Sequence, residues 1–235
     1  MGANIGTTVT SWLLGAIGME SSSFLVRLLQ PSTTSPLCAL VGVGVLMTSK
    51  RQRLQNIATV FVGFSILMFG MDTMSRAVQP LAELPEFTGI MTRFSNPFMG
   101  VAGGTFVTAL IQSSSAAVGI LQALSITGGV TYSLAIPMII GQNIGTCVTA
   151  LLAGIGACRN AQRTALIHLY LNVLGAVIFM SGFYGLNSIV RFSFMEKAAT
   201  PMGIAAIHSI FNVVVTVALF PFSGLLVRLV SLGKR

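Results

Sequence analysis

The chain has 235 residues, of which 54% are hydrophobic and only 8% are Asp, Glu, Lys or Arg. A soluble domain carries roughly 25% charged residues, so this composition excludes a soluble globular enzyme and indicates an integral membrane protein. The net charge of +8 comes from basic residues spread along the chain. They form no dense patch of the kind that nucleic-acid binding needs, so we expect the lipid bilayer, and no nucleic acid, as the partner.

In chain order, the apolar stretches that can form membrane helices are 5–19, 36–49, 56–72, 130–153, 164–186 and 203–230. A full crossing needs about 20 apolar residues. The last three stretches are long enough, whereas 36–49 and 56–72 need flanking residues to complete a crossing. The sequence therefore predicts an all-α protein with several membrane-spanning helices.

Two further apolar stretches, 98–111 and 115–128, are each too short to cross a bilayer. The polar residues Gln112, Ser113, Ser114 and Ser115 join them. Two short arms with a polar tip predict a re-entrant hairpin. Such a hairpin is tolerated at membrane depth only where protein or a water-filled cavity surrounds it.

The longest polar connection, residues 73–97, is predicted to be an external loop between two halves, 1–72 and 98–235. If the hairpin does not cross the bilayer, eight basic residues and no acidic residue fall on one side: Lys50, Arg51, Arg53, Arg159, Arg163, Arg228, Lys234 and Arg235. Cytoplasmic loops carry such an excess of basic residues. We therefore expect a multi-pass protein of the plasma membrane with both termini in the cytoplasm.

Residues 2–10 are repeated at residues 141–149, with seven of nine positions identical. Each copy contains Asn-Ile-Gly-Thr, and chance similarity between two apolar helices would match Leu and Ala rather than these residues in a fixed order. In the predicted topology the first copy runs outward and the second runs inward. Inverted repeats with broken helices are a common plan of secondary transporters, whose substrate site lies near the midplane where the halves meet.

The polar residues of the two copies are Asn4, Thr7 and Thr8 in the first and Asn143, Thr146 and Thr149 in the second. If the Gly breaks each helix, an unwound turn frees carbonyl oxygens, and the Asn and Thr side chains add neutral oxygens that suit a hard monovalent cation. The alternative is that Gly and Thr pack the helices closely and that each Thr bonds back to its own helix. The presence of two copies favours the ion site.

The tip of the hairpin, Gln112–Ser115, opens a helix. A helix N-terminus carries unpaired N–H donors and a partial positive charge, so it can hold an oxyanion without a cationic side chain. Serine hydroxyls can donate to an anion or bind a cation. Thr105 and Thr108 on the preceding arm are expected to extend the polar lining. The alternative is a serine-rich turn with a structural role alone.

The pattern His-x-x-x-Asn occurs twice, at His168/Asn172 and His208/Asn212, with the members of each pair one helical turn apart. No further His or carboxylate lies close in sequence, so a metal site is disfavoured and hydrogen bonds between helices are expected. Asp72 and Arg76 are expected to form an ion pair at i, i+4, with a cation ligand at Asp72 as the alternative.

The hairpin segment 104–116, with Gln-Ser-Ser-Ser at its tip, and the Gly-Gln-Asn-Ile-Gly-Thr element that follows it resemble the sodium-dependent phosphate cotransporter family (type II). Segment 63–81 and both His-x-x-x-Asn helices are also similar to that family, so the resemblance covers nearly the whole chain. It implies alternating-access symport of inorganic phosphate, with sodium as the coupling ion and no other cofactor. The candidate sodium ligands are then Ser113, Ser114, Ser115, Asn143 and Thr146.

One feature departs from the family, which has a Gln-Ser-Ser-Ser hairpin ahead of each Asn-Ile-Gly-Thr element. Here only the second element has one, and the first hairpin would precede Met1. The segment Glu20–Ser23 follows the first element and is not a substitute. We therefore expect another chain or segment to supply that hairpin, and the alternative to transport is an oxyanion-binding or accessory membrane subunit. An enzyme is not expected, because the Gly-x-Ser-x-Gly elbow of a serine hydrolase does not occur.

Overall fold

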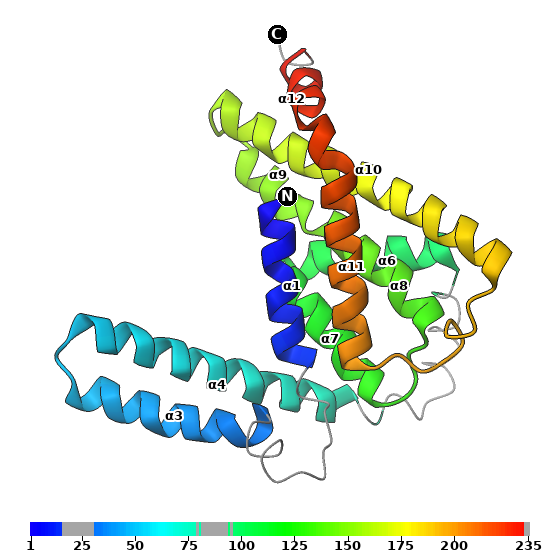
Figure 1. The fold of residues 1–235 in the computed structure, drawn as a ribbon. Helices are drawn as coiled ribbons and strands as arrows, with labels where there is room; N and C mark the ends of the chain where they lie inside the picture. The colour runs from blue at the N-terminus through cyan, green and yellow to red at the C-terminus, as the bar shows by residue number, and fades with distance from the viewer. Residues whose placement is uncertain (16–30, 79, 81–93, 95, 233–235) are drawn as a thin grey trace.

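The computed structural model describes residues 1–15, 31–78, 80, 94 and 96–232 (Figure 1). The helices are α1 (Gly2–Gly15), α3 (Pro31–Thr48), α4 (Gln52–Val78), α6 (Pro97–Ile111), α7 (Ser114–Ile126), α8 (Tyr132–Gly145), α9 (Cys147–Gly154), α10 (Arg159–Val190), α11 (Pro201–Leu219), the 3-10 turn η3 (Phe220–Phe222) and α12 (Ser223–Leu232). The described residues form no strand beyond one isolated bridge between Thr131 and Ala198. The prediction of an all-α membrane protein is confirmed.

Among the described helices, four are long and apolar enough to cross a membrane: Gln52–Gly70, Tyr132–Gly154, Arg159–Val190 and Pro201–Ser231. These four helices correspond to the predicted stretches 56–72, 130–153, 164–186 and 203–230. The stretch predicted at 36–49 forms α3, whose apolar part Thr34–Thr48 is shorter. Residues 5–15 lie in α1, and the rest of the predicted stretch 5–19 is outside the described residues. Helix α4 continues to Val78, past the predicted end at residue 72.

Capping residues in the sequence determine where α6 and α11 begin. The side-chain oxygen of Asn96 accepts a hydrogen bond from the amide of Phe98 at 3.0 Å, and Pro97 is the first residue of α6. The hydroxyl of Thr200 accepts from the amide of Gly203 at 3.0 Å, again just before a proline. Such caps satisfy amides that have no partner inside the helix, which fixes where the hairpin and α11 begin.

The span formed by α8 and α9 is the centre of the fold. About 67% of it is buried by other helices, compared with 17–28% for the other three spans. One cluster of buried apolar side chains joins α8 to α7, with Val118 and Ile139 among its members. A second joins α8 to α10 and α11 and includes Ile140 and Phe211. The outer helices expose many large apolar side chains, as surfaces in contact with lipid do.

Glycines bring α6 into close contact with α8. A Cβ atom at Gly104 would collide with the carbonyl of Met138, and one at Gly141 would collide with the carbonyl of Val101. Small residues allow helices in membranes to approach in this way. Among the described elements, α6 and α8 form the most extensive helix pair. The first arm of the hairpin therefore packs directly on the helix that carries the second copy of the repeat.

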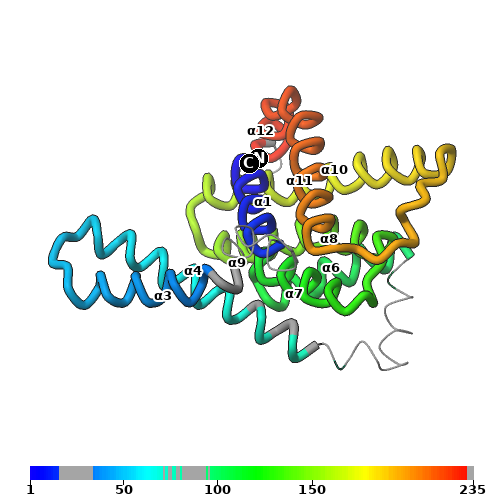
Figure 2. Tube along the Cα trace, turned by 60° about the horizontal axis from the view of Figure 1, so that its bottom comes forward, coloured from blue at the N-terminus to red at the C-terminus, as the bar shows by residue number. Residues whose placement is uncertain are grey.

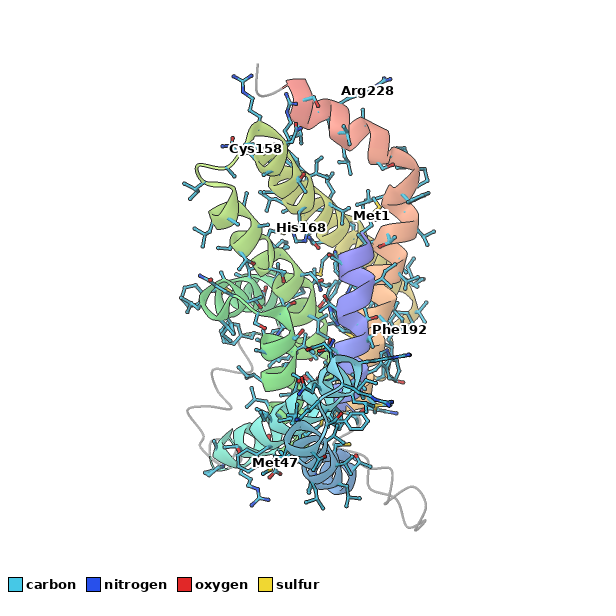
Figure 3. The ribbon with its side chains drawn as sticks, turned by 90° about the vertical axis from the view of Figure 1, so that its left-hand side faces the viewer. Met1, Met47, Cys158, His168, Phe192 and Arg228 are labelled. Carbon is cyan, nitrogen blue, oxygen red and sulfur yellow. The ribbon has the colours of Figure 1, made fainter. Side chains whose placement is uncertain are left out.

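The two copies of the repeat run in opposite directions. In Figures 1 and 3, α1 descends from the N-terminus, whereas the chain ascends through α8 and α9. An inverted repeat requires this relation of these two segments. The inversion of the complete halves, 1–72 and 98–235, stays a prediction.

Helices α3 and α4 form an antiparallel hairpin whose loop end extends away from the other helices (Figures 1 and 2). The hydroxyl of Ser65 donates to the carbonyl of Ser35 at 2.7 Å and ties the two helices together. Near the other end of α4, the Arg76 Nε lies 3.0 Å from the Asp72 carboxylate, which confirms the predicted ion pair. Both side chains are exposed, so the pair contributes little to stability.

Candidate functional site

The predicted hairpin consists of α6 and α7 joined by two residues. Gln112 adopts a left-handed conformation with φ 58°, and its amide donates to the carbonyl of Thr108 at 2.7 Å. Ser113 is extended and caps α7, because its hydroxyl accepts from the amide of Ala116 at 3.3 Å. Two short helices thus meet at the polar tip that the sequence predicts, while the depth of the tip in a bilayer stays a prediction.

Ser114 and Ser115 form the first turn of α7 and are half-buried, whereas Gln112 and Ser113 are exposed. The hydroxyls of Ser114 and Ser115 have no hydrogen-bond partner in the described part of the chain. The first amides of a helix also lack partners inside the helix. The tip therefore presents hydroxyl and amide donors at the positive end of α7, a combination that suits an oxyanion.

Both arms of the hairpin are fastened to the second copy of the repeat. On the first arm, the hydroxyl of Thr105 donates to the carbonyl of Gly141 at 3.1 Å as well as to its own helix. On the second arm, the carbonyl of Ala117 accepts from Nε2 of Gln142 at 3.1 Å. Thr108 packs against Gly145, and its buried hydroxyl has no partner among the described residues. The tip and the segment 141–145 thus form one unit.

The backbone of both copies remains helical, which corrects the prediction of an unwound turn. The first copy lies within the continuous helix α1. In the second copy the interruption between α8 and α9 is limited to Thr146, whose φ of −59° and ψ of −26° are helical and whose amide still donates to the carbonyl of Gln142. The glycines of this copy serve the close approach of α6 instead of an irregular backbone.

The threonines of the two copies bond to their own helices. Hydroxyls donate from Thr7 to the Ala3 carbonyl, from Thr8 to the Ile5 carbonyl, from Thr146 to the Gln142 carbonyl and from Thr149 to the Thr146 carbonyl, at 2.6–2.9 Å. This is the packing role that was the alternative to an ion site. Each hydroxyl oxygen retains its lone pairs, so it can still accept a hydrogen bond or coordinate a cation.

Asn172, on α10, joins the two copies. Its Oδ1 accepts from Nδ2 of Asn4 at 2.8 Å, and its own Nδ2 lies 3.3 Å from the Cys147 sulfur. The Cys147 thiol points to the carbonyl of Asn143 at 3.7 Å, and the amide of Asn143 donates to the carbonyl of Ile139 at 3.0 Å. A buried polar network therefore runs from the first Asn-Ile-Gly-Thr element to the second.

The bridging role of Asn172 was not predicted as part of the site. The His-x-x-x-Asn pattern did indicate hydrogen bonds between helices, and the contacts of Asn172 with Asn4 and Cys147 confirm this for the pair on α10. The pair His208/Asn212 on α11 makes no such bond to another helix within the described part of the chain. Within the α10 pair, Nδ2 of Asn172 also donates to the carbonyl of His168 at 3.0 Å. The repeated His-x-x-x-Asn pattern was the sequence signal for this role of Asn172. It could not identify the partner Asn4 on α1, which is 168 residues away in the chain.

A cavity of about 560 Å³ lies beside this network, between α1, α9 and α10. Met1, Asn4, Gly154 and His168 are among the residues that line it. Figure 3 shows Met1 and His168 at the same level of the molecule. A water molecule occupies about 30 Å³ in the liquid, so the cavity is large enough to bring water or a small hydrated ion to the first copy.

The candidate cation ligands are neutral. Among the described residues, no group of three His, Cys, Asp or Glu side chains lies close enough to hold a metal ion. Asn143 and Thr146 lie next to Gln142, which bonds to the start of α7 near Ser114 and Ser115. The segment Glu20–Ser23, which was not expected to replace the missing hairpin, is outside the described residues.

Comparison with known proteins gives a family match. The sequence model of a family described as Na+/Pi-cotransporter matches residues 1–76 and 66–216. An uncharacterized Bacillus subtilis protein, YqeW, is 27% identical over 99% of this chain and 70% of its own length. The putative inorganic phosphate export protein YjbB of Salmonella typhimurium is 25% identical over 84% of this chain, which spans 36% of it. Human sodium-dependent phosphate transport protein 2B is 28% identical over 61% of this chain and 20% of its own length. No solved structure matches the chain.

Proposed function

The chain belongs to the Na+/Pi-cotransporter family, and from this premise we propose that it transports inorganic phosphate across a membrane in symport with sodium. The names of two relatives, a putative phosphate exporter and a sodium-dependent phosphate transport protein, support phosphate as the substrate. The chain spans only about a third of the first of these and a fifth of the second, so the activity proposed here concerns the part of the transporter that this chain provides.

One observation carries the proposal. The hairpin tip, with its free serine hydroxyls at the N-terminus of α7, is fixed to the second Asn-Ile-Gly-Thr element by the Gln142–Ala117 and Thr105–Gly141 hydrogen bonds. This joint supports a site in which donors for an oxyanion adjoin neutral oxygens for a cation. Binding of an anion and a cation at adjacent positions lowers the cost of carrying either charge through a membrane.

In this mechanism, the hydroxyls and first amides of Ser114 and Ser115 hold phosphate. Oxygen atoms of the tip serines, Asn143 and Thr146 hold sodium. Alternating access then requires the two halves to move relative to each other. The network through Asn172 connects the Asn-Ile-Gly-Thr elements of both halves, so it is the part of the structure that must adjust when one side closes and the other opens. We place this transporter in the plasma membrane, with both termini in the cytoplasm.

The test is uptake of radiolabelled phosphate into proteoliposomes with an inward sodium gradient. We expect uptake that is lost when choline replaces sodium. The double variant S114A/S115A should lower uptake at least about tenfold, because each lost hydroxyl contact to a charged ligand is worth about 1.5–3 kcal/mol. Ser188→Ala, on the outer surface of α10, is the matched control and should keep full uptake.

Two results would contradict the proposal in different ways. Equal uptake in sodium and choline would rule out the coupling. Phosphate binding without uptake would favour the alternative of an oxyanion-binding or accessory subunit, to be followed by a search for a chain that supplies a second hairpin.

A further inference from the structure

Three buried polar side chains lie on α1, α7 and α11, three helices that pack on one another, separate from the hairpin tip. They are Ser11, Gln122 and His208, with 2%, 0% and 1% of their surface exposed. Helix α1 makes most of its contacts with α11 and α7. Three such groups inside a membrane protein are unfavourable unless something satisfies their hydrogen-bonding atoms.

The side-chain amide of Gln122 has a defined orientation. Its Nε2 donates to the carbonyl of Ser11 at 2.9 Å and to the carbonyl of Pro201 at 3.0 Å. The reverse orientation would place Oε1 against two carbonyl oxygens, which is repulsive. Oε1 therefore points away from both carbonyls, and it has no partner among the described residues.

Ser11 and His208 lie at the same level of the interface between α1 and α11. The next residues along each helix, Trp12 and Ser209, are joined by a hydrogen bond of 2.8 Å from Nε1 to Oγ. That bond lies at the exposed edge of the interface, so Ser11 and His208, one helical step away, lie on its buried side. The Ser11 hydroxyl and both ring nitrogens of His208 have no partner in the described part of the chain.

Comparison of the two His-x-x-x-Asn pairs indicates an open position on α11. In both pairs, Nδ2 of the Asn donates to the carbonyl of the His, at 3.0 Å for Asn172 and 2.9 Å for Asn212. Oδ1 of Asn172 accepts from Asn4, whereas Oδ1 of the buried Asn212 has no described partner. On α10, Asn4 supplies the hydrogen-bond donor for the Asn oxygen. On α11, no described residue donates to Asn212 Oδ1, so the position next to this oxygen, one helical turn from His208, is open.

We propose that Ser11, Gln122 and His208 form a second sodium site, at the junction of α1, α7 and α11. Its free atoms are an amide oxygen, a hydroxyl oxygen and an imidazole nitrogen, with the Asn212 oxygen one turn away. Gln122 Oε1 can only accept, so the ligand is a cation rather than an anion. The described parts of these three helices contain no carboxylate, which a divalent cation would require. The identity of the ion as sodium rests on the proposed function.

The test is thermal unfolding of the purified chain in detergent, without phosphate, in NaCl, KCl or choline chloride at equal ionic strength. The background variant S113A/S114A/S115A removes the serines of the hairpin tip, so the remaining sodium response reports on other sites. We expect sodium alone to raise the Tm in this background. Adding Ser11→Ala should raise the sodium concentration for half of this shift by about tenfold or more, the effect of losing one cation ligand.

Ser209→Ala is the matched control, because its hydroxyl faces Trp12 at the outer edge of the same interface. It should keep the sodium response even if its baseline Tm falls. Ser11→Ala breaks no hydrogen bond of the described chain, so its Tm in choline should stay the same or rise. His208→Gln, in the same background, should weaken the sodium response in the same direction as Ser11→Ala.

If the background variant shows no sodium-specific shift, or if Ser11→Ala responds to sodium as its parent does, the proposal is wrong and the junction holds water only. A sodium-specific shift that depends on Ser11, together with sodium-independent phosphate uptake, would overturn the proposed symport and leave this site intact.

Discussion

At the scale of the residue, the buried side chain of Asn172 joins two segments that are far apart in the chain. Both polar atoms of its side-chain amide are hydrogen-bonded: Oδ1 accepts from Asn4, and Nδ2 donates to the Cys147 sulfur and the His168 carbonyl. The His-x-x-x-Asn spacing predicted a role in hydrogen bonding between helices. It could not predict Asn4 as the partner, because an isolated pattern contains no information on which helix lies opposite.

We predict that Asn4 and Asn172 are energetically coupled. In a double-mutant cycle with Asn4→Ala and Asn172→Ala, the coupling free energy should be about 0.6 kcal/mol and at most about 1.7 kcal/mol, the range found for hydrogen bonds within membranes. Unfolding in mixed detergent provides the measurement. Asn160→Ala, at an exposed position near the start of α10, should show no coupling with Asn4→Ala, and additive effects of the first pair would contradict the prediction.

At the scale of the element, the helices of the two repeat copies differ from the expectation in one respect. Gly and Thr in Asn-Ile-Gly-Thr indicated a broken helix, but the threonines satisfy their hydroxyls on their own helices, and Gly145 of the second copy serves as a contact surface for α6. Glycine in a helix interior costs about 1 kcal/mol relative to alanine. The stabilisation gained from tight packing of two helices readily exceeds this cost. The hairpin helices themselves follow from local signals, since Asn96 and Ser113 cap them.

We predict that Gly104→Ala destabilises the hairpin. The added Cβ would collide with the backbone carbonyl of Met138, which cannot rotate away as a side chain does, so α6 must move off α8. The expected loss is about 1–3 kcal/mol, with reduced phosphate uptake. The measurement is the Tm of the variant beside its uptake rate.

Gly182→Ala is the control for this substitution, because a Cβ there meets nothing within 4 Å. It should be neutral or stabilise α10 by up to about 1 kcal/mol, since alanine is the better helix former. Equal effects of the two substitutions would show that the contact between α6 and α8 is not as tight as the structure indicates.

At the scale of the whole molecule, the central span of α8 and α9 is surrounded by α6, α7, α10 and α11, and α1 runs in the opposite direction beside α11 (Figures 1 and 3). The packed bundle therefore combines α1, from the first part of the chain, with the hairpin and the helices that follow it. The distribution of basic residues predicts which end faces the cytoplasm, and the structure adds that Cys158, just before α10, is exposed there.

We predict that the two ends of α10 react from opposite sides of the membrane. In a background without Cys38 and Cys147, a membrane-impermeant maleimide should label Cys158 in inverted vesicles only. Ser193→Cys, at the exposed turn after α10, should be labelled in right-side-out vesicles once Cys158 is also replaced. Labelling of both positions from the same side would contradict both the crossing by α10 and the cytoplasmic termini.

The sequence by itself determined the class of the protein, the position of most helices, the hairpin with its polar tip, and the paired Asn-Ile-Gly-Thr elements. These features depend on composition and on spacing within one segment, where apolar length, capping residues and exact repetition are sufficient. Only the tertiary structure decided that the glycines bring α6 against α8 without unwinding a helix, that Asn172 joins the two copies, and that Gln122 of α7 bonds to the Ser11 and Pro201 carbonyls of α1 and α11. Each of these depends on which helices are neighbours, and the packing of nonadjacent segments sets that relation.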